Sequence, residues 1–385
     1  MFDSWNAATI LVWGGLALLF YVSTGYPLLL VLVGLIRRQP RANLGYQPTV
    51  SILIAAYNEE TSIQNKLEQT LALDYPADRI EIIVLSDGST DRTDEIVRRF
   101  SDPRVRLLRA LQRKGKTYVQ NLGVDIARGE VLIFSDATTV YHPLALQYLA
   151  CNFSDPHVGA VSGRCQYFDE AEKSPTGLGT IAFWNYETFI KLMQSRISTI
   201  SGCTGCIYAV RRTAYTPLRP EVISDLVQPL WAIQKGYRVV FEDRALAHEE
   251  TTRSSGQEFS MRVRVVTRGM RGILSIPTLL NPFKYGWVSF QLLSHKVLRW
   301  LVPLFLMMVL IGSGALWHQP FYRALFVLQC AFYAFGLLTL IVPLHRVWKP
   351  LGIPLYFCTV NAAAFCSVLE VARGRKHVVW ETVRG

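Results

Sequence analysis

Long apolar runs lie at the two ends of this chain of 385 residues, and they set the first limit on its fold. Residues Ala7 to Ile36 are almost wholly apolar, which is too long for the hydrophobic core of a secretory signal. Gly272 to Lys296 is apolar but interrupted by prolines, and it predicts helices lying at a membrane surface. Three later stretches have membrane length, at Trp300 to Leu316, Ala324 to Leu344 and Pro350 to Leu369. The sequence therefore predicts four candidate spans.

Basic residues give these spans a direction. Arg37, Arg38 and Arg41 follow the first run, so the region after it is expected on the cytoplasmic face of the inner (plasma) membrane. Four complete spans would then put the C-terminus outside, yet Arg373 and Lys376 indicate the inside. The stretch from 350 to 369 is therefore expected either to cross the membrane or to lie re-entrant or along its surface.

Charge and cysteine content exclude some classes of function. The formal net charge is +11, but no DNA- or RNA-binding motif is present and many basic residues flank the apolar runs, so we expect no nucleic acid as partner. We attribute the excess to membrane orientation and to attraction of phosphorylated substrates. Cys203 and Cys206 have zinc-knuckle spacing without a second ligand pair nearby, which favours reduced cytoplasmic thiols over a metal or redox role.

The middle of the chain alternates strand-like and helix-like segments, as α/β domains do. Three apolar runs read as buried strands, at Thr49 to Ala56, Ile80 to Leu85 and Val131 to Phe134. Each is followed by carboxylates, including Glu59, Asp87 and Asp136. Parallel strands bring their carboxyl ends to one edge, where open sheets bind ligands. Each acid alone could be a turn former or helix cap, but three in order favour a site, with Asp136 foremost.

Helical signals follow the first two of these loops. Ile63, Leu67 and Leu71 recur four apart and predict a helix crossing back over the sheet. Asp91 is a candidate N-cap for a helix from Asp94 to Phe100. Further on, the stretch Arg113 to Thr117 opens a helix but lacks the glycine spacing of a P-loop, so an ATPase is not favoured. Its Lys116, at a helix N-terminus, suits a diphosphate.

The stretches AAYNEE, SDGSTDRT, RKGKT and FSDATT, in this order, resemble the nucleotide-sugar-binding half of a membrane-bound family-2 glycosyltransferase. Relatives of that kind include bacterial exopolysaccharide, cellulose, chitin and hyaluronan synthases. The resemblance implies an α/β GT-A-type nucleotide-diphospho-sugar transferase domain with a mixed, mainly parallel sheet, plus transmembrane and interfacial helices. It divides the chain into an anchor (1–41), the cytoplasmic transferase domain (42–271), interfacial helices (272–296) and a C-terminal transmembrane region (297–385).

The same resemblance assigns roles to residues. Asp225, in a short acidic motif at the head of a helix running to Gln234, matches the general base, although an N-cap is the simpler alternative. Asp136 stands where the family often has D-x-D, here Asp136-Ala137-Thr138, and implies Mg²⁺ or Mn²⁺ held together with the donor phosphates. Donor-binding roles fall to Ala56, Tyr57, Glu59, Asp87, Lys116, Asp136, Arg262 and Arg264.

Later segments resemble the acceptor half of the family. Residues 261–265 match the Q-x-x-R-W motif only in part, because its Gln and Trp are missing. Arg268 and Arg271 could equally face anionic lipid headgroups. Val158 to Phe168 predicts a strand pair and Gly177 to Ser198 a long aromatic helix, which is core or a sugar platform. The loop 201–206 is expected on the acceptor side.

Together these features predict an inverting enzyme that moves a sugar from a nucleotide-diphospho-sugar, expected to be a UDP-sugar, to a lipid or growing glycan. Exopolysaccharide or glycolipid synthesis, with other polysaccharide-synthesis subunits as partners, is the expected setting. Without the complete Q-x-x-R-W motif, we expect short products or single transfers. The alternatives are a single transfer to a membrane lipid and an inactive nucleotide-binding scaffold.

Overall fold

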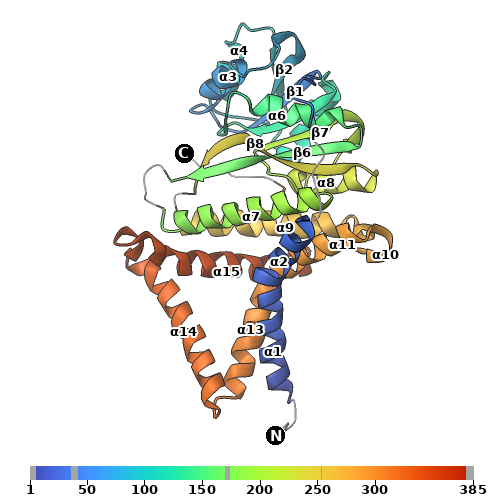
Figure 1. Cartoon of the computed structure of the whole chain (residues 1–385). Helices are drawn as coiled ribbons and strands as arrows, with labels where there is room; N and C mark the ends of the chain where they lie inside the picture. The colour runs from blue at the N-terminus through green and yellow to red at the C-terminus, as the bar shows by residue number, and fades with distance from the viewer. Residues whose placement is uncertain (1–5, 36–41, 170–173, 253, 379–385) are drawn as a thin grey trace.

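The computed structural model describes residues 6–35, 42–169, 174–252 and 254–378. A mixed sheet forms the centre of its larger domain (Figure 1). In chain order the strands are β1 (Val50–Ala56), β2 (Ile80–Ser86), β3 (Val105–Arg109), β4 (Val131–Asp136), β5 (Val140–Tyr141), β6 (Val158–Phe168), β7 (Ile207–Arg211) and β8 (Arg238–Glu250). In space their order is β3-β2-β1-β4-β7-β6-β8-β5. The first four pair in parallel, β7 runs antiparallel to both of its neighbours, and β8 is parallel to β6, which confirms the predicted mixed α/β sheet.

Helices cover both faces of this sheet, which explains why β1, β2 and β4 are continuous apolar runs. The helices are α3 (Ile63–Leu71), α4 (Thr93–Arg98), α5 (Lys116–Ile126), α6 (Ala145–Ala150), α7 (Gly177–Ile197) and α8 (Ser224–Gln234). Ile63 and Leu67 of α3 join the core on one face, and Val119 of α5 and Val227 of α8 join the core on the other. The strand ends are thus held between two packed layers.

Two sequence predictions for this domain are wrong in detail. Val158 to Phe168 is a single strand rather than a strand pair, because it pairs with β8 along its length and with β7 over residues 160–162. Its pairing with β8 shifts register between Val158 and Ala160 and again between Gly163 and Arg164. The sequence pattern also predicts a strand from Tyr237 to Glu242, but β8 continues to Glu250, so Glu249 and Glu250 belong to the sheet.

The remaining helices carry the apolar runs. They are α1 (Ala7–Phe20), α2 (Tyr26–Gly34), α9 (Ser255–Leu274), α10 (Pro282–Tyr285), α11 (Trp287–Leu292), α12 (Leu298–Trp300), α13 (Val302–Ala315), α14 (Pro320–Ile341) and α15 (Ile353–Ala372), with π-helical turns at Tyr21–Gly25 and Leu293–Val297. Within the described ranges, three helices are long and apolar enough to span a membrane, Ala7–Gly34, Pro320–Ile341 and Lys349–Ala372. A pair bent by 56°, Trp287–Trp300 with Val302–Ala315, would make a fourth.

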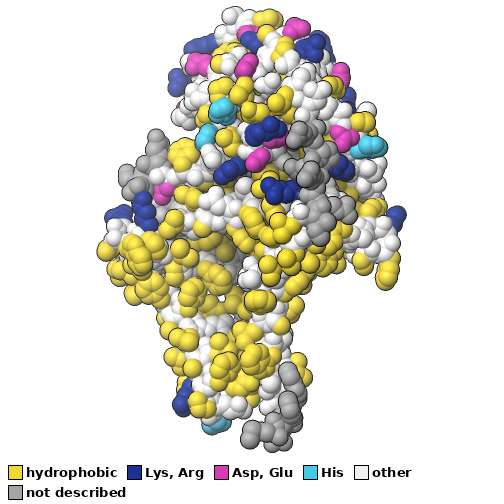
Figure 2. Space-filling view, viewed as in Figure 1, with side chains coloured by type: hydrophobic (Ala, Val, Ile, Leu, Met, Phe, Trp, Pro, Cys, Tyr) yellow, Lys and Arg dark blue, Asp and Glu magenta, His cyan; other side chains and the backbone are white. Residues whose placement is uncertain are grey.

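These helices do not all run in the same direction. In Figure 1, α1, α13 and α14 extend away from the sheet domain, whereas α15 lies across them, beside α9. Figure 2 shows hydrophobic side chains gathered over the extended helices and charged ones over the sheet domain. Phe20, Leu328 and Ile341 are among these exposed apolar residues. The exposed apolar surface fits contact with lipid chains.

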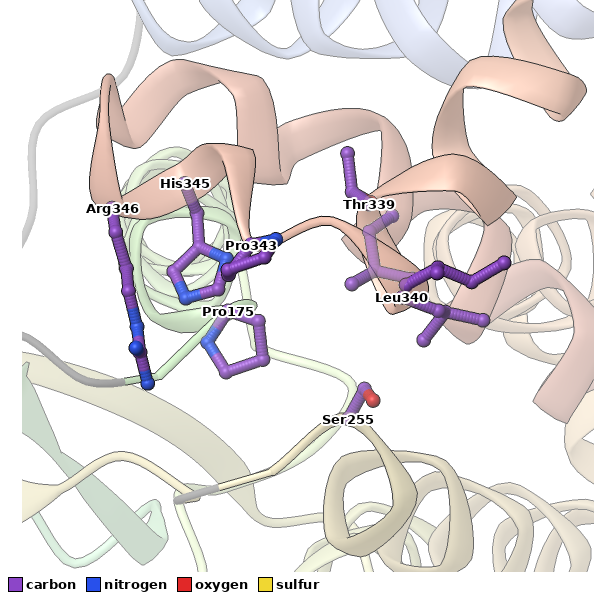
Figure 3. A pocket seen from close by; sticks show the side chains of 9 residues that line it. Pro175, Ser255, Thr339, Leu340, Pro343, His345 and Arg346 are labelled. Atoms are coloured by element: carbon purple, nitrogen blue, oxygen red, sulfur yellow. The ribbon is translucent and has the colours of Figure 1, made fainter.

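A cavity of about 240 Å³ lies where the end of α14 and the start of α15 meet the segments that begin α7 and α9 (Figure 3). Pro175, Ser255 and His345 are on its wall. None of its lining residues is among the predicted site residues, which lie at the strand ends or on α9.

Candidate active site at the strand ends

Three residues predicted from separate stretches of sequence meet at the carboxyl end of β4. The Lys116 ammonium, in the first turn of α5, forms an ion pair with the Asp136 carboxylate at the end of β4. Its Nζ also lies 3.4 Å from the carbonyl oxygen of Gly205. A Cβ added to Gly205 would approach Asp225 Oδ2 to 2.5 Å, so this loop passes close to the Asp225 carboxylate. Lys116, Asp136 and Asp225 are therefore brought together.

Asp225 has the environment of a proton acceptor. Burial raises the pKa of its carboxyl, against the opposing charges of Lys116 and Lys191. Within the described part of the chain, its Oδ1 atom is buried and has no hydrogen-bond partner. The N-cap position of α8 is held by Ile223, and no side chain makes a capping bond there. The alternative reading of Asp225 as a helix cap is therefore wrong.

The Asp136 carboxylate keeps Lys116 protonated. Burial by itself would lower the pKa of this ammonium, but the charge and hydrogen bond of Asp136 outweigh burial and raise the pKa. Lys116 is therefore positively charged at neutral pH, beside the free N–H groups that begin α5.

Asp87 holds the turn that presents Lys116. Its carboxylate is fully buried and accepts the backbone N–H groups of Lys114 and Gly115, each at 2.8 Å. Gly115 has a φ of 96°, a conformation that favours glycine. Burial raises the pKa of Asp87 in spite of these two bonds. Its expected contact with the nucleotide base stays a prediction.

The loops after β1 and β2 are tied together. Ala56 accepts the N–H of Asp87 at 2.9 Å, and the N–H of Glu59 donates to Thr93 Oγ1 at 2.8 Å. Asp91 is not the N-cap itself, since Arg92 holds that position. Instead its carboxylate accepts the N–H groups of Thr93 and Glu60, both at 3.0 Å. These bonds fix the shape of the predicted donor edge.

Tyr57 contributes a flat surface to this edge. The guanidinium of Arg113 stacks over its ring at 3.8 Å from the ring centre. A planar cation held over an aromatic ring is a surface on which a nucleotide base can stack. Sequence reasoning did not single out Arg113 for this role.

The arginines of α9 face two directions. Arg262 pairs with the buried Glu258 at 2.8 Å and donates to Tyr356 Oη at 2.9 Å, so the structure does not bring it to the Lys116 group. Arg268 donates to Thr117 Oγ1 at 2.9 Å, and its charge acts on Asp225. Arg264 lies one helical turn from Arg268, and its positive charge contributes to lowering the pKa of Arg268. Arg268 is buried, so the lipid-facing alternative is wrong for this residue.

Two buried lysines near the site were missed by the sequence analysis. Lys191 of α7 donates to Thr204 Oγ1 at 2.7 Å, and its charge reaches Asp225. Lys66 of α3 donates to the carbonyl of Thr139 at 2.7 Å, and burial lowers its pKa to about 7. The sequence did carry a signal that Lys66 is buried, because Lys66 lies on the same face of α3 as the buried Ile63.

A further charge cluster joins α7 to residues 295–299, which precede α13. The buried Glu187 accepts His295 Nε2 at 3.0 Å and pairs with Lys296 at 3.5 Å and with Arg299. Burial would raise the pKa of Glu187, but Lys296, His295 and Arg299 together hold it well below its usual range. Glu187 is therefore a charged anchor between α7 of the sheet domain and the helical segment at residues 295–299.

With this geometry in place, the family can be stated. Residues 51–218 match the model described as glycosyl transferase family 2. The chain carries a family-2 glycosyltransferase domain. It is 30% identical over 223 residues to the probable glycosyltransferase YdaM of Bacillus subtilis (strain 168), covering 54% of this chain and 52% of that protein. It is 26% identical over 249 residues to the poly-beta-1,6-N-acetyl-D-glucosamine synthase of Staphylococcus aureus (strain COL), covering 62% of this chain and 59% of that protein. The chain thus spans between half and three-fifths of the length of these curated relatives.

A solved structure shows the same architecture. The mannosyltransferase PcManGT from Pyrobaculum calidifontis, in complex with GDP-Man and Mn²⁺, superposes with a TM-score of 0.72 at 20% identity. The match covers 95% of this chain and 98% of the other chain. Because the identity is only 20%, the match shows a shared fold. The predicted family-2 resemblance and GT-A-type fold are confirmed.

Proposed function

We propose that the chain is a membrane-bound, inverting glycosyltransferase that moves a sugar from a nucleotide-diphospho-sugar to a lipid or glycan acceptor at the cytoplasmic membrane surface. The observation that carries this proposal is the meeting of Lys116, Asp136 and Asp225 at the end of β4. A cation, a metal-binding carboxylate and a proton acceptor are the parts that glycosyl transfer with a diphosphate leaving group requires.

On the donor side, Asp136 is the residue that would hold a divalent cation. Its side chain is 32% exposed at the strand end, so a carboxylate oxygen is accessible to Mg²⁺ or Mn²⁺. The metal would supply charge stabilisation for the departing diphosphate. Lys116 and the N–H groups of α5 then bind the phosphates directly. Ala56, Tyr57, Glu59 and Asp87 shape the base pocket, and a UDP-sugar remains the proposed donor.

On the acceptor side, Asp225 takes the proton from the attacking hydroxyl. Its raised pKa makes it a stronger base than an ordinary carboxylate, and its free Oδ1 is the atom that receives the proton. Lys191 and Arg268 keep it charged before transfer, since both oppose the effect of burial. We place Arg264 near the diphosphate and give Arg262 a structural role through Glu258.

We also propose the domain limits given above, with residues 42–271 in the cytoplasm. If α1, α13 and α14 cross the membrane and α15 lies on its surface, the C-terminal residues return to the catalytic side, as their charge requires. Lys376 pairs with Glu221 of the catalytic domain at 3.4 Å, and Val378 lies against Gly115. These contacts favour the surface-lying alternative for residues 350–369.

One curated relative supports the proposed acceptor class. It is a poly-beta-1,6-N-acetyl-D-glucosamine synthase, which supports polysaccharide synthesis as the setting, and we propose that other subunits take part. A scaffold without turnover is less well supported, because it has no need for a buried carboxylate oxygen such as Asp225 Oδ1, which has no hydrogen-bond partner among the described residues.

The test uses the full chain in detergent with membrane lipids, a panel of radiolabelled nucleotide sugars, and Mg²⁺ or Mn²⁺. We expect label from one donor to reach lipid or polymer, and we expect chelation to stop the transfer. Donor binding without transfer of any label, also in native membranes, would favour the scaffold.

A further inference from the structure

The two cysteines of the C-x-x-C motif lie on opposite faces of the sheet. Cys203 packs in the core that contains Leu226 and Val227, whereas Cys206 packs in the core on the other face. The motif therefore cannot direct both thiols to one ion. Cys206 has a different neighbour in its own core, Cys165 of β6, which stands 41 positions earlier in the printed sequence.

A compact set of potential ligands surrounds Cys206. One ligand atom each from Cys165, Cys206 and Glu249 lies within 4.8 Å of the other two, and all three residues are buried. The Cys165 thiol donates to Glu249 Oε2 at 3.8 Å. Cys165 is on β6, Cys206 directly precedes β7, and Glu249 is on β8; β6 lies between the other two strands. The sheet itself fixes their spacing.

We propose that Cys165, Cys206 and Glu249 bind a structural Zn²⁺ ion, with water as the fourth ligand. In tetrahedral coordination, with Zn–S near 2.3 Å and Zn–O about 2.1 Å, ligand atoms lie roughly 3.6–3.8 Å apart. The observed spacing reaches this with small side-chain movements. Thiolate ligands favour zinc over Mg²⁺ or Mn²⁺, so the site is chemically distinct from the one proposed at Asp136. Binding releases the two thiol protons to solvent.

Charge balance supports the site. Two thiolates and one carboxylate around Zn²⁺ leave one net negative charge, and the buried ammonium of Lys66 lies within electrostatic range of Cys206 and Glu249. The Lys66 ammonium also lies 4.1 Å from the ring centre of Tyr141, whose hydroxyl donates to the Cys206 carbonyl at 3.0 Å. Residues behind the ligands thus hold Cys206 and neutralise the complex.

The cluster lies beside a groove, through which an ion could enter, and next to the end of β4, which an ion could stabilise. A groove of about 380 Å³, lined by Cys165, Trp184 and His248 among others, opens beside the cluster and is a route for zinc and water. The pairing of β4 with β7 joins Ser135 to Ile207, so Cys206 stands opposite Asp136. A zinc ion here would brace three strands directly behind the donor edge.

The experiment measures metal rather than transfer. Untagged full-length protein, purified in detergent without added metal, is expected to contain about one zinc per chain. Co²⁺ replacing the zinc should give a thiolate-to-cobalt charge-transfer band that a large excess of Mg²⁺ or Mn²⁺ leaves unchanged. Cys165→Ser and Cys206→Ser should lose both zinc and the band, and Glu249→Gln should weaken retention. Cys203→Ser is the matched control and should keep both.

Three results would overturn the proposal. These are wild-type protein that neither contains zinc nor gives the cobalt band, a Cys206→Ser variant that retains the full metal content, and a Cys165–Cys206 disulfide in the freshly purified protein. Because the cobalt spectrum is recorded on the wild type, the test holds even if a serine variant fails to fold.

Discussion

Asp225→Asn tests the chemistry most directly. The substitution keeps the side-chain shape and removes only the capacity to take a proton. The structure predicts little change in stability, since α8 does not use this side chain as a cap and Oδ1 makes no hydrogen bond among the described residues. Removing a carboxylate whose pKa is raised by burial also removes a desolvation cost.

Transfer should fall by about 10² to 10⁴, the usual contribution of a positioned base. This corresponds to roughly 3–5 kcal/mol in the activation barrier, at 1.36 kcal/mol for each tenfold change. Donor affinity should change little, because Lys116 and Asp136 keep their ion pair. The measurement is single-turnover transfer of radiolabelled sugar, with donor binding followed separately.

The pH profile gives a second readout. The base acts only when deprotonated, so wild-type transfer should decline as pH falls through the pKa of Asp225, which burial raises above 3.8. The Asn variant should lose this acidic limb. Asp125→Asn, at an exposed position of α5, is the matched control and should behave as wild type. Near-normal transfer by Asp225→Asn would refute the assignment and direct the search to other carboxylates.

Four other perturbations test separate parts of the reasoning. Asp136→Asn should weaken Mn²⁺ and donor binding as well as turnover, measured by calorimetric titration, because its contacts exist before the transition state; unchanged binding would contradict this. Gly115→Ala should cost about 1 kcal/mol or more, seen in denaturant unfolding, because the positive φ and the nearby Val378 carbonyl both oppose a Cβ. Glu187→Gln should lower stability by about 1–3 kcal/mol because the partly buried Lys296 and Arg299 lose their carboxylate partner, and an unchanged melting temperature would exclude the anchor role. A reporter fused to the C-terminus should be active only in the cytoplasm, and periplasmic activity would show that α15 crosses the membrane.

Sequence periodicity predicted the parts of the fold that depend on local pattern. Strands β1, β2 and β4 are apolar runs ending in turn residues, and α5 and α8 begin at the expected positions. The parallel order of these strands and the start of α5 at Lys116 bring Asp136 and Lys116 together, and their roles in catalysis stay predictions. The strand pair expected at 158–168 is one strand, whose register with β8 shifts between Gly163 and Arg164, and such a shift depends on the partner strand rather than on local sequence.

What the sequence could not give depends on which way side chains face. Arg262 and Arg268 are both basic positions of one helix, yet one pairs with Glu258 and the other contacts Thr117. Cys203 and Cys206 appear as a pair in the sequence but are divided by the sheet. Such differences are set by tertiary packing, which a short motif does not encode.

The contacts of residues 376 and 378 with the catalytic domain also bear on how the protein is made. These residues leave the ribosome after every membrane helix described here, yet they touch Glu221 and the Gly115 turn that presents Lys116. The transferase domain can fold as soon as it is synthesised. The turn at Gly115 nevertheless gains its contact with Val378 only after the candidate membrane helices have been translated, so the final shape of this turn depends on chain that is made after them.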